Sequence, residues 1–162
     1  MAKRQNDRRQ SGGYRRILWP TDFSPVAKAA VPHALRLADA DAELVILHVW
    51  APPVMVAPPP APGVSWVRLD KELREAAREQ LQRATEDVRA RGGKVRVRNL
   101  LVQGAPVAQI SRVAKRLACD LIVLATHGRT GLRHVLLGSV AENVVRYAPC
   151  PVLTVRPGRA PK

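Results

Sequence analysis

Residues Leu121 to Val155 read LIVLATHGRTGLRHVLLGSVAENVVRYAPCPVLTV, and the order of patterns within this stretch decides the fold. The first five residues are typical of a buried strand, and a glycine-containing loop, Thr126 to Ser139, follows them. A helical segment, VAENVVRYAPC, then leads to a second short strand, PVLTV. In this order, a glycine lets the backbone approach a phosphate, and the first free N–H groups of the helix point toward it. The stretch therefore predicts an anion site, with phosphate as the first candidate ligand, in an α/β protein.

The sequence upstream alternates between strand and helix patterns in the same way. Apolar runs at Arg16–Pro20 and Glu43–Val49 predict strands, and the second run is continuous, as expected for a central parallel strand. Lys94–Val102 alternates charge with valine, which predicts an edge strand with one face in water. The first predicted helix begins at Ser24-Pro25, bends at Pro32 and reaches Ala38. The second is a long amphipathic helix at Arg68–Arg91, and the third is at Pro106–Leu117 with Ile110 inward. The apolar residues on one side of the second are Leu69, Leu73, Ala77, Leu81, Ala84 and Val88.

Strands separated by helices indicate parallel strands joined by right-handed crossovers. Five such strands predict a doubly wound parallel sheet with helices on both faces and the strand order 3-2-1-4-5. Ligands of such sheets bind at the carboxyl ends of the strands, where the strand order reverses. Asp22 follows the first strand and the Thr126–Ser139 loop follows the fourth, so both flank this point.

The polar groups at this point have a ligand-binding interpretation and a structural one. The N–H groups of Ser139 and Val140, with the Ser139 hydroxyl, would face a phosphate, and Asp22 suits a ribose hydroxyl or an adenine amine. Alternatively, Asp22 only caps a turn and Ser139 only caps a helix. Their convergence on one crevice favours ligand binding.

The length of 162 residues predicts one domain at 15–157, with a proline-rich loop at 51–67 and flexible tails at 1–14 and 158–162. The chain shows no signal-peptide pattern and no run of the roughly 20 apolar residues that a membrane span needs, so we expect no membrane association. Two cysteines, Cys119 and Cys150, are too few for a disulfide framework. They indicate reduced core thiols, which predicts a cytoplasmic protein.

The net charge of +14 is concentrated in three regions. Met1–Arg16 carries a net +5, Arg89–Arg98 carries +5 without an acid, and Arg156–Lys162 carries +3. A flexible basic tail attracts any polyanion by counterion release, without sequence specificity. Because zinc-finger spacing and an aromatic RNA-binding signature are both absent, we expect no specific nucleic-acid recognition. An arginine-rich solubilising surface is the favoured interpretation.

Several motifs together resemble the universal stress protein family. They are Thr126-His127-Gly128, then Gly138-Ser139, then AENVVRYAPCPVLTVR, and upstream of these the ILWPTDFS of 17–24, the ELVILHV of 43–49 and the VQG of 102–104. The resemblance covers about residues 15 to 156. It implies a Rossmann-like, adenine nucleotide alpha hydrolase-like fold and a stress-responsive sensor or regulator that binds ATP.

ATP-binding members of that family have the motif G-x2-G-x9-G-[ST], and its register here gives Ala125, Gly128, Gly138 and Ser139. Alanine at the first position is a departure that predicts weaker binding while keeping the backbone N–H. The same register implies that the Val49 backbone meets the adenine ring, and Mg²⁺ would arrive with the nucleotide, bound mainly by phosphate oxygens. The candidate nucleotide-contacting residues are Pro20, Thr21, Asp22, Val49, Ala125, Thr126, His127, Gly128, Arg129, Gly138, Ser139 and Val140.

We assign no catalytic residue and no metal site. The absence of G-x4-G-K-[ST] excludes a P-loop ATPase, and no G-x-G-x-x-G follows a strand, which disfavours dinucleotide binding. We expect His48 to be a satisfied core residue and His127 to have a structural role. Because no positioned base accompanies a metal-binding carboxylate, any ATP hydrolysis would be slow. The alternatives are the same fold acting only through protein contact, a slow ATP-hydrolysing or nucleotidyl-transferring enzyme, and nucleic-acid association through the basic tail.

The last predicted strand, Pro151–Val155, is apolar and lies at the sheet edge opposite Lys94–Val102. An exposed apolar edge invites pairing with another chain, and the resemblance implies a homodimer through this strand. The alternative is an edge covered by the C-terminal tail. A regulator also implies an unknown protein partner, which no residue of the chain identifies.

Overall fold

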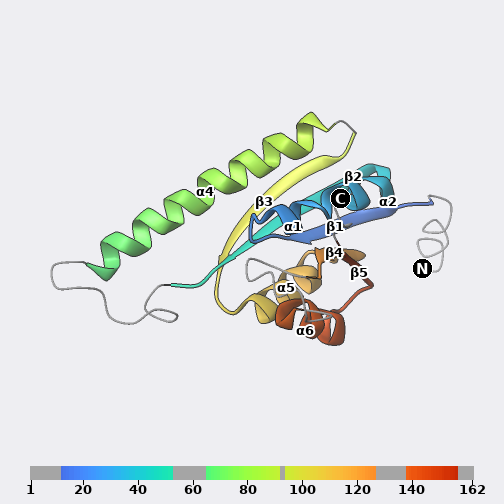
Figure 1. Cartoon of the computed structure of the whole chain (residues 1–162). Coiled ribbons are helices and arrows are strands. Elements are labelled where there is room, and N and C mark those ends of the chain that lie inside the picture. The colour runs from blue at the N-terminus through green and yellow to red at the C-terminus, as the bar shows by residue number, and fades with distance from the viewer. Residues whose placement is uncertain (1–11, 53–64, 92–93, 127–137, 157–162) are drawn as a thin grey trace, which may run out of the picture.

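Five parallel strands form one sheet in the computed structural model, which describes residues 12–52, 65–91, 94–126 and 138–156. The strands are β1 (Tyr14–Pro20), β2 (Ala38–Trp50), β3 (Arg96–Gln103), β4 (Leu121–Ala125) and β5 (Val152–Val155). They lie in the order β3-β2-β1-β4-β5 (Figure 1). The predicted doubly wound sheet and its 3-2-1-4-5 order are therefore confirmed, with β3 and β5 at its two edges.

Helices cover both faces of this sheet. They are α1 (Pro25–Lys28), α2 (Val31–Leu37), α4 (Trp66–Ala90), α5 (Pro106–Arg116) and α6 (Ser139–Tyr147). Alternate residues of a strand point to opposite faces, so Ile17 and Trp19 of β1 pack in the core under α2 and α4, while Leu18 packs under α5 and α6. Burial on both faces explains why the central strands are continuous apolar runs. None of the described helices is both long enough and apolar enough to cross a bilayer.

The first predicted helix is two short helices rather than one bent helix. After α1, the N–H groups of Ala29 and Ala30 donate to carbonyls three residues earlier, each at 3.2 Å, which tightens the chain. Pro32 then lacks the N–H that would continue α-helical bonding across this point. The second helix is also shorter than predicted, because β2 begins at Ala38 and not at Glu43.

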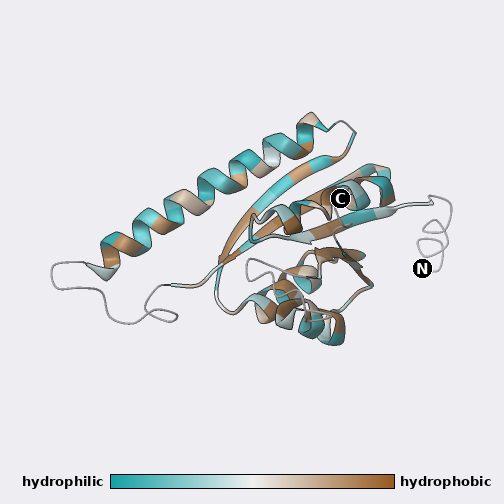
Figure 2. Ribbon diagram, viewed as in Figure 1, coloured by the Kyte–Doolittle hydropathy of each residue, from teal (hydrophilic) through white to brown (hydrophobic). Residues whose placement is uncertain are grey.

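Only the second half of α4 packs as predicted. The residues of its buried stripe are Ala77, Leu81, Ala84, Thr85 and Val88. In contrast, Leu73 is 41% exposed, Val67 is 80% exposed, and Leu69 lies outside both cores. Figures 1 and 2 show this N-terminal half, with its mixture of polar and apolar residues, extending away from the strands. The apolar side of α4 is therefore buried only along its second half, because periodicity identifies the apolar side of a helix and not the reach of the neighbouring sheet.

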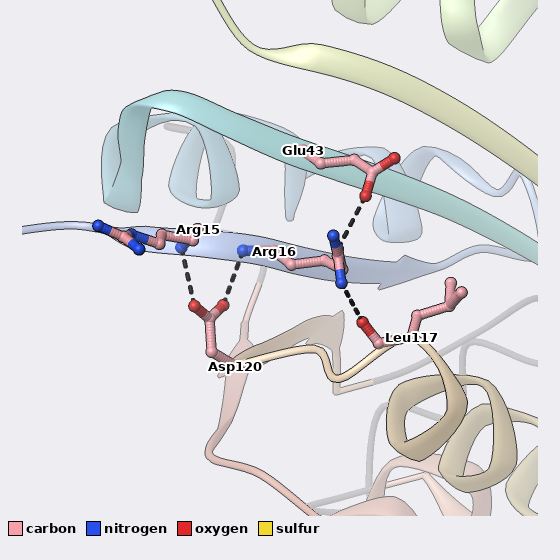
Figure 3. Close-up of polar contacts among 5 residues, drawn as sticks. All are labelled: Arg15, Arg16, Glu43, Leu117 and Asp120. Atoms are coloured by element: carbon pink, nitrogen blue, oxygen red, sulfur yellow. Dashed lines mark hydrogen bonds and ion pairs between the residues drawn. The ribbon is translucent and has the colours of Figure 1, made fainter. Parts of the chain in front are cut away.

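A polar network joins β1, β2 and the start of β4 (Figure 3). Asp120, just before β4, accepts the backbone N–H groups of Arg15 and Arg16 of β1, each at 2.9 Å. The Arg16 side chain donates through Nε to Glu43 of β2 at 2.8 Å and also donates to the Leu117 carbonyl. Hydrogen bonds to a charged acceptor are the stronger kind, so Asp120 fixes the start of β4 against β1.

Replacing Asp120 with alanine removes both acceptors, and we expect the free energy of unfolding to fall by roughly 1–3 kcal/mol. Asp120→Asn keeps one amide oxygen as an acceptor and should cost less than the alanine variant. Urea unfolding of the two variants beside the unsubstituted protein measures both effects. An unchanged free energy in Asp120→Ala would contradict this role of Asp120.

The two cysteines are free thiols, and they differ in burial. Cys119 is buried, as predicted, whereas Cys150 is only partly buried. Burial, with the nearby Cys150, raises the pKa of the Cys119 thiol to about 12. Burial and the Asp120 carboxylate also raise the pKa of Cys150. Because the thiolate is the reactive form, neither cysteine is activated.

We expect iodoacetamide to alkylate Cys150 well before Cys119 in the folded protein. Cys119 is inaccessible, and a pKa of about 12 rather than 9.0 lowers its thiolate fraction about a thousandfold at mildly alkaline pH. Mass spectrometry of the labelled peptides gives the two rates, and labelling in urea should remove the difference. Equal rates in the folded protein would show that the Cys119 environment opens readily.

Candidate functional site

A cleft of about 360 Å³ opens at the carboxyl ends of β1, β2 and β4, where the strand order reverses. The predicted site residues that line it are Pro20, Thr21, Asp22, Val49, Ala125, Thr126, Gly138, Ser139 and Val140. The other three, His127, Gly128 and Arg129, lie outside the described residues. The topology thus brings together segments that are more than a hundred residues apart in sequence.

Side chains of the turn after β1 build one wall of the cleft. Thr21 Oγ1 accepts the Phe23 N–H and Asp22 Oδ1 accepts the Ser24 N–H, both at 3.0 Å. Phe23 has φ of 65°, a left-handed conformation that is uncommon for a residue with a side chain. Asp and Thr side chains stabilise such turns by bonding to the backbone two residues on. Asp22 therefore does cap a turn, and the same bond fixes its carboxylate group beside the cleft.

The opposite wall is the amino end of α6. Gly138 is the N-cap residue, and its N–H donates to the Thr126 carbonyl at 2.7 Å. The first intrahelical bond runs from the Glu142 N–H to the Gly138 carbonyl at 2.9 Å, so the N–H groups between them have no helical acceptor. These groups and the positive end of the helix dipole favour an anion. The N-cap residue is Gly138 and Ser139 is the first helical residue, so the alternative that Ser139 caps the helix was wrong.

His48 is a cleft residue that the sequence did not reveal. It lies near the end of β2, half-buried on the cleft wall rather than in the core. Its Nδ1 is 2.8 Å from the Thr21 carbonyl oxygen, which can only accept, so Nδ1 carries the hydrogen. The Phe23 ring packs against the imidazole, with 4.4 Å between the ring centroids. His48 thereby joins the end of β2 to the turn that carries Asp22.

Apolar side chains cover the cleft between its polar walls. Leu47 and Leu124 come from strand ends, and Pro106 and Ile110 come from the first turns of α5. None of these four was predicted as a site residue, although Ile110 was expected to face inward. Its place in the cleft follows from topology, because α5 crosses β2 on its path from β3 to β4. No local sequence motif predicts that a helix will line the cleft in this way.

The described part of the cleft suits binding better than bond breaking. Asp22 is the one carboxylate among the described lining residues. No group of three or more His, Cys, Asp or Glu side chains among the described residues could hold a metal ion. Backbone donors at one end, apolar side chains in the middle and a carboxylate opposite fit a ligand with a phosphate, a flat ring and hydroxyl groups.

Residues 13–156 match the model of the universal stress protein family. The universal stress protein MJ0531 of Methanocaldococcus jannaschii is 38% identical over 147 residues, which are 88% of this chain and 82% of that protein. The structure of MJ0577 from the same organism is 30% identical and superposes with a TM-score of 0.77, over 91% of this chain and 99% of that one.

A universal stress protein solved in complex with cAMP is 25% identical, with a TM-score of 0.65 over 89% of this chain and 98% of that chain. The family model spans the whole sheet, from the start of β1 to the end of β5. The resemblance predicted from the motifs is therefore confirmed, and this chain belongs to the universal stress protein family.

Proposed function

We propose that the cleft binds an adenine nucleotide and that the protein is a nucleotide-responsive regulator in a stress response. The observation that carries this proposal is the cleft itself, in which the amino end of α6 faces the Asp22 turn across apolar side chains. A member of the same family solved with cAMP supports the nucleotide class.

ATP has a group to match each part of the cleft. Its phosphates suit the N–H groups at the start of α6, its ring suits the apolar region near Val49 and Ile110, and its ribose hydroxyls suit Asp22. Mg²⁺ would be held mainly by the phosphate oxygens. The volume of about 360 Å³ is within the range of about 300–1,000 Å³ typical of small-molecule sites.

The competing proposal is that the cleft of this family member binds no nucleotide and that the protein acts through contact with other proteins. Ala125 favours it, because a methyl group stands where the family motif has glycine. Ala125 lies at the end of β4, however, and leaves the backbone donors that follow Gly138 unchanged. The enzymatic alternative, slow ATP hydrolysis, would depend on Asp22 as the one carboxylate among the described lining residues.

We also propose that the protein forms a homodimer through β5. β5 pairs with β4 on its inner side and occupies one edge of the sheet. An apolar edge strand invites pairing with a second copy. Nucleotide binding at the start of α6 would then alter a surface close to the dimer edge, which a protein partner could read.

Gly138→Asp should separate nucleotide binding from stability. Aspartate is a better N-cap than glycine and its charge suits the helix dipole, so the melting temperature should hold or rise. The same charge repels phosphates, so the ATP affinity should fall at least about tenfold. Gly138→Asn caps without a charge and is the matched control, which should bind ATP more tightly than the aspartate variant. Calorimetric titration of nucleotide-free protein with ATP and Mg²⁺ measures the affinities.

The same titrations discriminate between the proposals. An absence of binding heat in the unsubstituted protein would reject nucleotide binding and favour a protein that acts only through contact with other proteins. Equal affinities of the aspartate and asparagine variants would mean that the phosphates do not lie at α6. Release of phosphate during the titration, lost in Asp22→Ala, would favour the enzyme.

His48 should act as a positioning residue for the Asp22 turn. An asparagine amide nitrogen falls near the position of Nδ1 and can donate to Thr21, whereas a glutamine amide falls near Nε2. We therefore expect His48→Asn to keep ATP affinity within about threefold and His48→Gln to lose about tenfold. Both variants lose the Phe23 ring contact, so equal losses would attribute the effect to packing rather than to the hydrogen bond.

A further inference from the structure

Positive charge is concentrated in the part of the chain between Val88 and Cys119. This segment contains no acidic residue, and its basic residues are Arg89, Arg91, Lys94, Arg96, Arg98, Arg112, Lys115 and Arg116. On α4, in contrast, basic side chains are balanced by acids four residues away, as in the pairs Arg68–Glu72 and Arg83–Glu79. The net charge of +14 is therefore unevenly spread over the fold.

The edge strand β3 presents two of these arginines on one face of the sheet. Val95 and Val97 pack in the core on the α4 side, and Asn99 donates to Thr85 of α4 at 3.0 Å. Because side chains alternate along a strand, Arg96 and Arg98 point to the other face, the one that α5 covers. Both are exposed.

The helix α5 presents two more arginines toward the same strand. Its buried residues Ile110, Val113 and Ala114 face the sheet. Gln109 Nε2 donates to the Gln103 carbonyl at the end of β3 at 2.8 Å, so the side of α5 that carries Gln109 faces β3. Arg112 and Arg116 are three and seven residues further on, which places them along that same side. Both are exposed.

We call the surface formed by Arg96, Arg98, Arg112 and Arg116 the arginine surface. Within the described residues, none of the four makes an ion pair at 4.0 Å or less. The carboxylate beside Arg96 is that of Glu43, its neighbour in the β2–β3 register, and Arg16 already binds Glu43 at 2.8 Å. Two further acids, Asp39 and Asp41, lie at the start of β2, and Asp41 is exposed. The arginine surface therefore has an excess of positive charge.

The four arginines lie in two short rows, one along β3 and one along α5. Arg96 and Arg98 are roughly 7 Å apart along β3, and Arg112 and Arg116 are about 6 Å apart along α5. All four are arginine, whose planar guanidinium group binds phosphate oxygens in pairs. Aromatic side chains, which would stack on bases, are absent from β3 and α5. The contacts that remain are those of arginine with phosphate, and such contacts carry no sequence information.

We propose that the arginine surface binds the sugar–phosphate backbone of single-stranded nucleic acid, independently of sequence. It lies toward the amino end of β3, whereas the nucleotide cleft lies at the carboxyl ends of the strands. The two sites therefore do not compete for space, and this proposal stands whether or not the cleft binds ATP.

The test is the salt dependence of binding by the full chain. The probe is a fluorescein-labelled mixed-sequence DNA strand of about 20 nucleotides, followed by anisotropy from about 50 to about 200 mM NaCl. Replacing all four arginines with glutamine should lower the slope of log affinity against log salt by about 3, since each single-strand phosphate contact contributes about 0.7. The matched control, with Arg68, Lys71, Arg74 and Arg83 of α4 changed to glutamine, loses the same charge and should keep its slope.

Two results would overturn the proposal. An equal fall in slope for both variants would show that net charge, and not this surface, attracts DNA. Displacement of the probe by polyglutamate as effectively as by unlabelled DNA would indicate an acidic protein as the partner instead. If thermal melting shows that the fourfold variant is unfolded, Arg112→Gln with Arg116→Gln on the exposed side of α5 should still lower the slope by about 1.4.

Discussion

β1 is hydrogen-bonded to β2 on one side and to β4 on the other, and the position of every other element follows from this central strand. Its middle residues, Ile17, Leu18 and Trp19, are buried to 99% or more, so helices must cover both faces of the sheet. The chain moves outward from β1 first in one direction and then in the other. The connections therefore leave on opposite faces, and the cleft opens between them.

The sequence predicted the fold well because its signals are local and repeated. Continuous apolar runs identified the central strands, and the charge alternation of 94–102 identified the edge strand. The errors concern tertiary context. The break between α1 and α2 depends on how Pro32 meets a tightened turn, and the exposure of Leu73 depends on where the sheet ends. The helical spacing of apolar residues predicts neither the geometry of that turn nor the end of the sheet.

The candidate site likewise contains residues that the sequence could predict and residues that it could not. Residues in motifs, such as Asp22 and Gly138, were predictable because a turn or a helix start needs particular backbone behaviour. His48 and Pro106 carry no such signal. His48 reaches the cleft because the end of β2 lies beside the turn after β1, and Pro106 reaches it because α5 crosses β2. Gly138 also affects the local stability of α6. Glycine gives up the side-chain cap that serine would provide, and in exchange the backbone donors are left uncovered.

The bonds from Asp120 to Arg15 and Arg16 have a consequence for how the chain folds. These partners are 105 and 104 residues apart, so the central strand cannot complete its pairing until most of the chain has been synthesised. β1 and β2 can pair early, but the β4-facing side of β1 then remains an open edge in the nascent protein. Non-local parallel pairing is slow, and open edges attract other chains. The interval before β4 arrives is therefore the stage of biogenesis at which this protein is most exposed to aggregation and most dependent on protection by the ribosome or a chaperone.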